Sequence, residues 1–381
     1  METLLSIIVP TKNRYFYLKE MINMFQSYSN KSTELIIQDN STDNTEFAVY
    51  IKNISCSSIY YYYESTPLSI VENMDCAVMH AHGKYICALG DDDIYSGYLE
   101  AFVEYMDKSG IESAMFNNSS IYFWPGMHFI VHPLPSLMIQ KFKKSLNKIS
   151  PLTERVKCMK AGAINLGLLP RIYHGVVRRS AMQRVFEQTG TYFPGASPDM
   201  ASSIALSFYV KNHCYCDVPL IVSGKSPNSV VGKEGRHPAN EIKNVRHLPQ
   251  NIEEMWPPFL PEFWSAGTIW TQSLFEAMTR TGHADELKDF NYAACYANIA
   301  VFEGAYRKRL VPFLKGHYLL LIKFLIECMK LFALRVKVFL KNSALTRFHL
   351  TSMYIRDHVE NSCKASEIID QYIKSAIETE K

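Results

Sequence analysis

Residues 4–90 alternate short apolar runs with segments of helical periodicity, and this order restricts the fold more than any other feature of the chain. Four runs have the length and the β-branched and aromatic content of strands. They are residues 4–10, 34–39, 58–65 and 84–90. Between them, apolar residues recur at helical spacing over residues 15–25, 47–54 and 69–83, the last with Gly83 expected as its C-cap. The β-α-β-α-β-α-β order predicts an α/β protein with a mostly parallel, Rossmann-like sheet and helices on both faces.

Polar residues gather where these strands end. Thr11–Arg14 follow the first strand, Asp39–Asp43 the second and Asp91–Asp93 the fourth. Ligands bind beyond the carboxyl ends of the strands in such sheets, so we expect one ligand site there. Three adjacent carboxylates repel one another. Capping of the following helix would account for one or two of them, whereas a divalent cation would stabilise all three, and their place at the ligand edge favours the cation.

The composition excludes several other classes of protein. With 381 residues, 48% of them hydrophobic and 20% charged, the chain has enough apolar content for one large folded domain with an appendage. The net charge of +3 gives no sign of nucleic-acid binding. Nine scattered cysteines without a CxxC pair argue against a zinc site or a disulfide framework and suggest a reducing compartment.

The sequence also lacks targeting segments and the common nucleotide motifs. Its first apolar run ends at Pro10 without a basic start, so we expect no signal peptide, and no uncharged stretch is long enough for a conventional membrane-spanning helix. No GxGxxG follows the first strand and no GxxxxGKS/T occurs anywhere. The usual dinucleotide and P-loop sites are therefore excluded.

Three stretches together resemble the family 2 glycosyltransferases, which are inverting enzymes of GT-A fold, and in particular those of O-antigen and capsule polysaccharide synthesis. They read SIIVPTKNR, LIIQDNSTDNT and NMDCAVMHAHGKYICALGDDDIY. The resemblance covers about residues 4–110 and continues more weakly to about residue 225. Many relatives have Asp-Ser-Asp-Asp where this chain has Gly90 followed by Asp91–Asp93. Whether Asp91 or Asp93 assists Asp92 at a metal is therefore left open.

The resemblance implies a role for each of these residues. Asp92 with Asp93 would hold Mg²⁺ or Mn²⁺, which neutralises the diphosphate that leaves from a nucleotide-sugar. Asp39 would accept the N3–H of a uracil or thymine ring. The other residues expected to contact the donor are Pro10, Thr11, Arg14, Asp91 and Asn73. For Asn73, an exposed helix position without a ligand is an equal alternative.

An inverting transfer also needs a base, which in this family is a carboxylate downstream of the metal motif. Asp199 fits, because a Pro- and Gly-rich loop ends there and a helical pattern begins. The alternative is that Asp199 only caps this helix. His174, in RIYHGVVRRSAM, is expected to line the acceptor pocket or, alternatively, to be structural.

A loop at residues 223–238 is rich in Gly, Ser and Asn and carries Lys233, Arg236 and His237. Such a loop could close over the donor diphosphate and exclude water, or it could simply be a solvated connection.

The C-terminal part has a different character from residue 240 onward, with helical patterns and no strand pattern. We expect residues 1–225 to form the catalytic domain and residues 226–381 a helical region. Near residues 317–342 a broad apolar face lies under a basic stripe, the pattern of a helix in an anionic membrane interface. A core helix packed on the catalytic domain is the alternative.

The resemblance to family 2 glycosyltransferases implies an inverting hexosyl- or N-acetylhexosaminyltransferase. It would use a UDP-sugar, or a dTDP-sugar, and a glycan or polyprenyl-linked acceptor in bacterial surface polysaccharide synthesis. We expect it in the cytoplasm, or on the inner face of the cell membrane. The alternatives are a sugar-nucleotide nucleotidyltransferase, which should have a Gly-rich loop where this chain has PTKNR, and a non-catalytic nucleotide-sugar-binding module.

Overall fold

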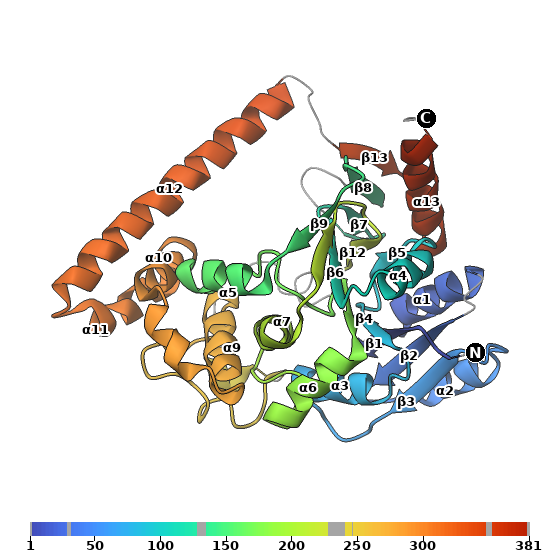
Figure 1. The fold of residues 1–381 in the computed structure, drawn as a ribbon, viewed down its shortest axis with the longest axis horizontal. Coiled ribbons are helices and arrows are strands. Elements are labelled where there is room, and N and C mark those ends of the chain that lie inside the picture. The colour runs from blue at the N-terminus through green and yellow to red at the C-terminus, as the bar shows by residue number, and fades with distance from the viewer. Residues whose placement is uncertain are drawn as a thin grey trace.

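The computed structural model describes residues 2–28, 32–127, 135–227, 241–245, 247–347 and 353–378, with the backbone only for 341–347. Its centre is an eight-stranded sheet with the strand order β3-β2-β1-β4-β10-β6-β11-β9 (Figure 1). These strands are β1 (Leu5–Thr11), β2 (Thr33–Asp39), β3 (Ile59–Tyr63), β4 (Tyr85–Ala88), β6 (Ser113–Phe116), β9 (Leu146–Ile149), β10 (Gly175–Arg178) and β11 (His213–Cys216).

The first four strands in this order are parallel to one another, as the sequence predicts. β10 runs antiparallel to both β4 and β6, and β9 runs antiparallel to β11. The sheet is therefore mostly parallel with antiparallel strands in its second half. The predicted α/β fold class, the GT-A type of mostly parallel sheet with a helical C-terminal region, is confirmed.

Helices cover both faces of the sheet because its strands alternate two sets of apolar side chains. Leu5, Ile7 and Val9 of β1 face one core, whereas Ile8 faces the other. The first core includes α1 (Tyr15–Ser27), α2 (Thr45–Lys52), α4 (Leu99–Lys108) and α13 (Ser362–Glu378). The second includes α3 (Ile70–Met79), α6 (Arg179–Thr189) and α7 (Pro198–Tyr209).

A smaller sheet, of order β13-β8-β7-β12-β5, stands beside the first. Its strands are β5 (Ile94–Tyr95), β7 (Ile121–Phe123), β8 (Ser136–Gln140), β12 (Ile221–Lys225) and β13 (Met353–Asp357). The expectation of no strand beyond residue 240 is wrong, because β13 pairs antiparallel with β8. A five-residue strand at the end of a helical region has little signal of its own, and pairing with β8 supplies its hydrogen bonds.

The described residues between 242 and 347 form helices joined by loops, and their core is shared with α5 and α7. The elements here are α5 (Pro151–Lys160), η1 (Ile242–Asn244), α9 (Ala266–Arg280), η2 (Ala284–Asp289), α10 (Tyr292–Phe302), η3 (Gly304–Leu310), α11 (Val311–Leu314) and α12 (Tyr318–Arg347). After α12 the chain returns to the first core through α13, which packs on α1 (Figure 1). A domain division at residue 225 stays a prediction.

Gly83 does not cap α3, as the sequence had suggested, because this helix ends at Met79 with His80 as its C-cap. Gly83 instead lies against β1, where an added Cβ would be 2.6 Å from the backbone nitrogen of Ser6. The close approach of backbones, rather than helix termination, is the reason for a glycine at this position.

Candidate active site

The register of the parallel strands brings the predicted site residues together. Thr11 at the end of β1 is paired with Asp39 at the end of β2. On the other side of β1, Ile8 is paired with Ala88, which leaves the acidic triplet just beyond the end of β4. The carboxyl ends of three neighbouring strands thus meet at one edge of the sheet, as the sequence predicts.

Arg14 is held between two carboxylates of the acidic triplet. Its Nε donates to Asp91 Oδ1 at 2.6 Å, and its Nη2 lies 2.7 Å from Asp92 Oδ2. The Thr11 hydroxyl donates to the other oxygen of Asp91 at 2.7 Å, and Ser226 donates to Asp92 Oδ2. Burial raises the pKa of Asp91 to about 7, although Arg14 acts in the opposite direction. A cation is therefore needed here, and in this arrangement Arg14 supplies the charge.

Asp93 is bound on both of its carboxylate oxygens. His174 Nε2 lies 2.7 Å from Oδ2, which also accepts the backbone N–H of Gly90, and Gly224 donates its N–H to Oδ1 at 2.9 Å. Burial alone would raise the pKa of Asp93, but His174 and these hydrogen bonds outweigh it and hold the pKa below its usual value. His174 adopts the left-handed conformation, with φ of 55°. The fold thus directs this ring at Asp93, immediately before β10 begins.

The two capping alternatives are not supported. Helix α4 has Tyr98 as its N-cap without a side-chain hydrogen bond, and β5 separates it from the acidic triplet. The N-cap of α7 is Ser197, so Asp199 is the second residue of that helix rather than its cap.

Asp199 differs from the other acidic residues of this site. It is only partly buried, and among the described residues no hydrogen bond reaches its carboxylate. Burial raises its pKa, while the nearby positive charges of His174 and Arg171 partly counteract the shift. A carboxylate with a raised pKa and unoccupied oxygens can accept a proton. Helix α7 holds it there because its apolar residues pack into two cores, against the sheet and against α5 and α9.

Residues 6–167 match the family model for glycosyl transferase family 2, whose span contains β1, β2, β4 and the acidic triplet. This match identifies a glycosyl transferase family 2 domain in residues 6–167 of the chain. The match extends beyond the region of strong resemblance but ends before Asp199. No curated protein sequence matches the chain.

Solved glycosyltransferase structures resemble the chain at low identity. S. aureus TarS residues 1–349 in complex with UDP-GlcNAc is 14% identical, with 86% of this chain and 89% of that chain covered and a TM-score of 0.47. A mannosyltransferase from Pyrobaculum calidifontis, PcManGT, in complex with GDP-Man and Mn²⁺, is 12% identical over 86% of this chain and 88% of that chain, with a TM-score of 0.41. Against the longer TarS crystal structure, the match spans 37% of that chain and 59% of this one, at 16% identity and a TM-score of 0.42.

GT-A glycosyltransferases commonly use a divalent metal, and the residues of this chain can be tested for one. Within the described part of the chain, no three His, Cys, Asp or Glu side chains are grouped as a metal site. Mg²⁺ and Mn²⁺ sites need only one or two carboxylates when substrate phosphates supply further oxygens. Oδ1 of Asp92 accepts no hydrogen bond from the described residues, in contrast to both oxygens of Asp91 and Asp93. The residues therefore fit a metal held by Asp92 and completed by a diphosphate.

Asp39 is fully buried. Its Oδ2 accepts hydrogen bonds from the hydroxyls of Tyr15 and Tyr61, each at 2.7 Å, and its Oδ1 accepts the Ser41 N–H. Oδ1 accepts only one hydrogen bond from the described residues, so it keeps a lone pair that suits a pyrimidine N3–H, although the carboxylate is fully buried in this structure. The role of Asp39 at the base stays a prediction, and so does that of Pro10, the neighbour of Thr11 in β1.

Asn73 is buried in α3 rather than exposed, so that alternative is wrong. Its side-chain oxygen, Oδ1, has no hydrogen-bond partner among the described residues. A buried amide oxygen of this kind is normally satisfied by a partner or by water. Its contact with the donor stays a prediction.

Several contacts of the site could not be found from the sequence. The Trp124 indole donates to the Asp92 backbone carbonyl at 2.8 Å, and Gly224 lies so close to that carbonyl that a Cβ would overlap it. Only the Gly-rich composition around residue 224 hinted at such an approach. Lys233, Arg236 and His237, the predicted basic loop, lie outside the described residues.

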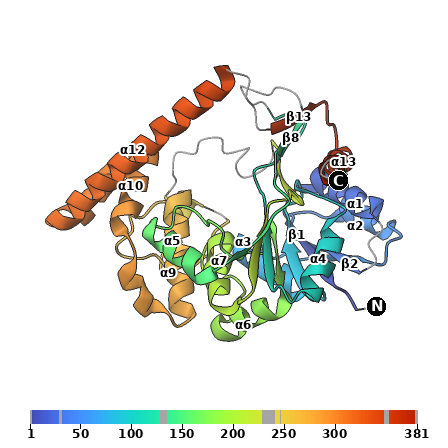
Figure 2. The same cartoon turned by 45° about the horizontal axis from the view of Figure 1, so that its top comes forward.

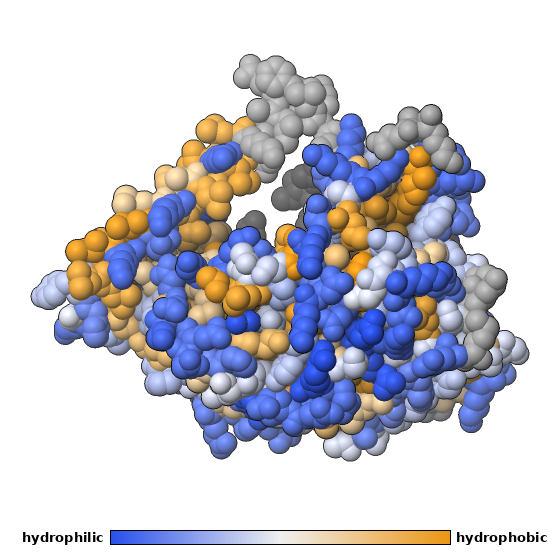
Figure 3. Space-filling model, in the orientation of Figure 1, coloured by the Kyte–Doolittle hydropathy of each residue, from blue (hydrophilic) through white to orange (hydrophobic). Residues whose placement is uncertain are grey.

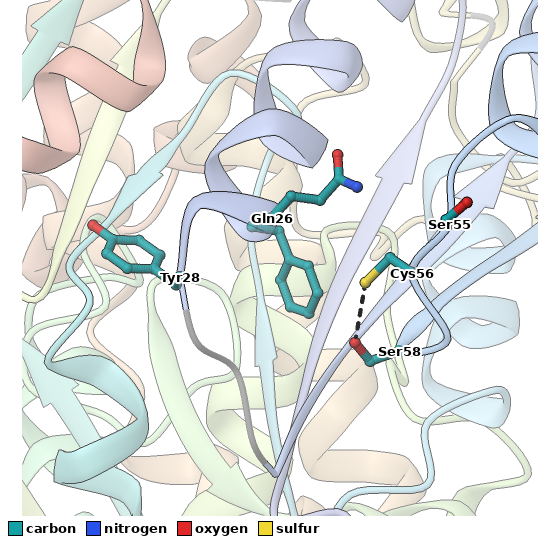
Figure 4. Close-up of a pocket in the computed structure, with 6 residues that line it drawn as sticks. Gln26, Tyr28, Ser55, Cys56 and Ser58 are labelled. Carbon is teal, nitrogen blue, oxygen red and sulfur yellow. Dashed lines mark hydrogen bonds between the residues drawn. The ribbon is translucent and has the colours of Figure 1, made fainter.

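A shallow pocket of about 200 Å³ lies elsewhere (Figure 4). Phe25, Gln26 and Tyr28 line it at the end of α1, and Ser55, Cys56 and Ser58 line it just before β3. These segments are at the amino ends of the parallel strands, opposite the carboxylates. The pocket is therefore not part of the candidate site.

Proposed function

We propose that the chain transfers a hexosyl or N-acetylhexosaminyl group, with inversion, from a nucleotide-sugar to a hydroxyl group of an acceptor. Asp199 carries this proposal, because it is partly open to solvent, unbound by the described residues and next to the carboxylates at the sheet edge. The reaction requires a base on the acceptor side and a cation on the diphosphate side, and both kinds of residue are here. We place the catalytic domain within residues 1–225, with the helical region after it.

On the acceptor side, Asp199 would take the proton of the acceptor hydroxyl as its oxygen attacks the anomeric carbon. The sugar–phosphate bond breaks in the same step, and its electron pair stays on the diphosphate. Burial raises the pKa of Asp199, which makes it a stronger base than an exposed aspartate. Arg171 supplies positive charge nearby and the ring of His174 is close enough to influence Asp199, so an acceptor bound there would lie beside His174.

On the donor side, Arg14 and Thr11 hold the acidic triplet and keep its charges apart from one another. We assign the metal, Mn²⁺ or Mg²⁺, to Asp92, where it would neutralise the developing charge of the diphosphate. Both oxygens of Asp93 are already bound, by His174 and Gly90 on one side and by Gly224 on the other, so we assign Asp93 the role of fixing the end of β4. Asp91 would act on the donor indirectly, by holding the side chain of Arg14 in place.

The donor and acceptor classes follow from the family resemblance. A UDP-sugar is favoured and a dTDP-sugar is the alternative, because Asp39 would pair with a pyrimidine N3–H. The acceptor would be a glycan or a polyprenyl-linked saccharide of a bacterial surface polysaccharide of the O-antigen or capsule type. An enzyme with such an acceptor would work in the cytoplasm or at the inner face of the membrane.

A matrix of nucleotide-sugars and metals tests this proposal. UDP-, dTDP- and GDP-sugars would each be combined with Mn²⁺, Mg²⁺ or a chelator, and thermal stabilisation and release of the nucleotide would be measured. We expect the largest effects for a UDP-sugar with metal, and NMR of the product should show the opposite anomeric configuration from the donor. If no nucleotide-sugar stabilises the protein or is turned over, the proposed function is wrong.

A further inference from the structure

Helix α12 presents a continuous apolar stripe that the rest of the described chain does not cover. The helix is 30 residues long, about 45 Å at 1.5 Å per residue, and lies at the outer side of α10, away from the main sheet in both ribbon views (Figures 1 and 2). The residues of the stripe recur at intervals of three and four up to Phe339, which Leu340 follows directly, and each is between 41 and 69% exposed apart from Tyr318, at 79%. They are Tyr318, Ile322, Leu325, Met329, Phe332, Val336, Phe339 and Leu340.

The opposite side of α12 explains why the helix keeps this orientation. Leu320 and Phe324 pack into the core that contains α10. The helix is therefore fixed by a narrow face near its start, and the apolar stripe is directed outward, as are the apolar side chains of Leu319, Leu334 and Val338. Figure 3 shows this apolar surface along α12, broken by hydrophilic patches. A core helix packed on the catalytic domain, the alternative drawn from the sequence, would bury these side chains, and α12 does not.

Three lysines follow the stripe along one flank. Lys323, Lys330 and Lys337 are seven residues apart and exposed, so they share one line on the helix, each directly after a residue of the stripe. Arg335 lies on the other flank, with its guanidinium 5.1 Å from the centre of the Phe302 ring. Glu327 is the one acidic residue between residues 318 and 340, and it pairs with Lys330 at 2.9 Å.

These observations favour a lipid surface over a second copy of the helix. In a two-helix interface the positions beside the apolar seam usually carry pairs of opposite charges. Here Leu321 and Ile326 stand beside the seam, and the charges around it are almost all positive. A second copy would bring the same positive charge, whereas an anionic membrane brings the complementary one. None of the described helices is both long and apolar enough to cross a bilayer, so the contact would be along the surface.

We propose that α12 lies in the interface of an anionic membrane, with its apolar stripe among the acyl chains and Lys323, Lys330 and Lys337 at the headgroups. Long lysine side chains can reach the headgroups from positions beside an inserted face. The inference is independent of the proposed sugar donor. It places the glycosyltransferase where a lipid-anchored acceptor would be concentrated.

Flotation with phosphatidylcholine vesicles, with and without phosphatidylglycerol, tests the proposal on the full chain. We expect the protein to float with the anionic vesicles and to be partly released by salt, because salt screens the attraction between the lysines and the anionic headgroups. The triple variant Lys323→Glu, Lys330→Glu, Lys337→Glu should bind them at least about tenfold more weakly. The matched control Lys52→Glu, Lys211→Glu, Lys374→Glu makes the same change in net charge on exposed lysines of other elements and should keep nearly all binding.

A second measurement addresses the apolar stripe. Hydrogen exchange across residues 318–340 should slow when anionic vesicles are added, and Met329→Glu with Phe332→Glu should abolish flotation at low and high salt alike. Donor-induced thermal stabilisation reports whether each variant is folded. Equal flotation of the wild type and both α12 variants would overturn the proposal. So would an intact protein that ignores anionic vesicles but dissociates from an oligomer to a monomer on Met329→Glu with Phe332→Glu.

Discussion

The acidic triplet after β4 and the carboxylate at the start of α7 belong to one site but are held in opposite ways. Five of the six triplet oxygens accept hydrogen bonds from the chain or pair with Arg14 or His174. Asp199 receives no hydrogen bond from the described residues. The first arrangement fixes positions at the end of a strand, and the second leaves the carboxylate of Asp199 without a partner among the described residues. The proposed division of roles, a structural triplet with a metal at Asp92 and a base at Asp199, rests on this difference.

The largest expected effect is that of Asp92→Ala. The variant loses the one triplet oxygen that is open to a ligand, together with a partner of Arg14. We expect transfer to fall by at least about a thousandfold, and metal-dependent binding of the donor to disappear. Isothermal titration with and without Mn²⁺ measures the second effect. Asp285→Ala, an exposed aspartate of η2, is the matched control and should change neither. If Asp92→Ala kept normal metal-dependent turnover, the assignment of the metal to this triplet would be wrong.

Asp199→Asn tests the other half of the comparison. Asparagine keeps the shape of the side chain but cannot take the proton, so kcat should fall by at least about a hundredfold while donor affinity stays nearly constant. Steady-state kinetics with the donor varied separates the two. Ser197→Ala, at the N-cap without a side-chain hydrogen bond, should leave kcat nearly intact. A loss of thermal stability in Asp199→Asn with full kcat would favour a structural role.

Asp75 gives a smaller effect and serves as a reference outside the chemistry. Its carboxylate accepts hydrogen bonds from the Thr191 hydroxyl at 2.6 Å and from the Tyr192 N–H at 2.8 Å. Burial raises its pKa to about 6. The folded state therefore binds its proton more tightly than the unfolded state, and stability from this group is lost as pH rises from about 4 through about 6.

Asp75→Asn stays neutral and should lack this dependence. Its free energy of unfolding relative to wild type should rise by roughly 1–3 kcal/mol between acidic and neutral pH, with kcat little changed. Urea denaturation across this pH range measures it. The same pH dependence of stability in both proteins would show that Asp75 does not titrate in this way. A large loss of kcat in Asp75→Asn would show that Asp75 contributes to catalysis and is not a purely structural carboxylate.

Much of the fold could be predicted because its information is local. The runs that became β1, β2, β3 and β4 and the helices between them are encoded in periodicity within a few residues, and the predicted ranges agree closely with the observed ones. The sheet edge followed from that order, so the acidic triplet, Asp39 and Thr11 could be expected together. Gly83 was misjudged because its role depends on Ser6, far away in the sequence.

By itself, then, the sequence determined the parallel core, the carboxyl edge and which acidic residues stand at it, since neighbouring residues decide strands, helices and turns. Only the tertiary structure decided how each carboxylate is used. His174 is 81 residues from Asp93, Ser226 is 134 residues from Asp92, and β13 pairs with β8 across more than two hundred residues. It also decided that α12 turns its apolar stripe outward. Hydrogen bonds and burial depend on contacts between distant segments, and those contacts exist only once the chain has folded.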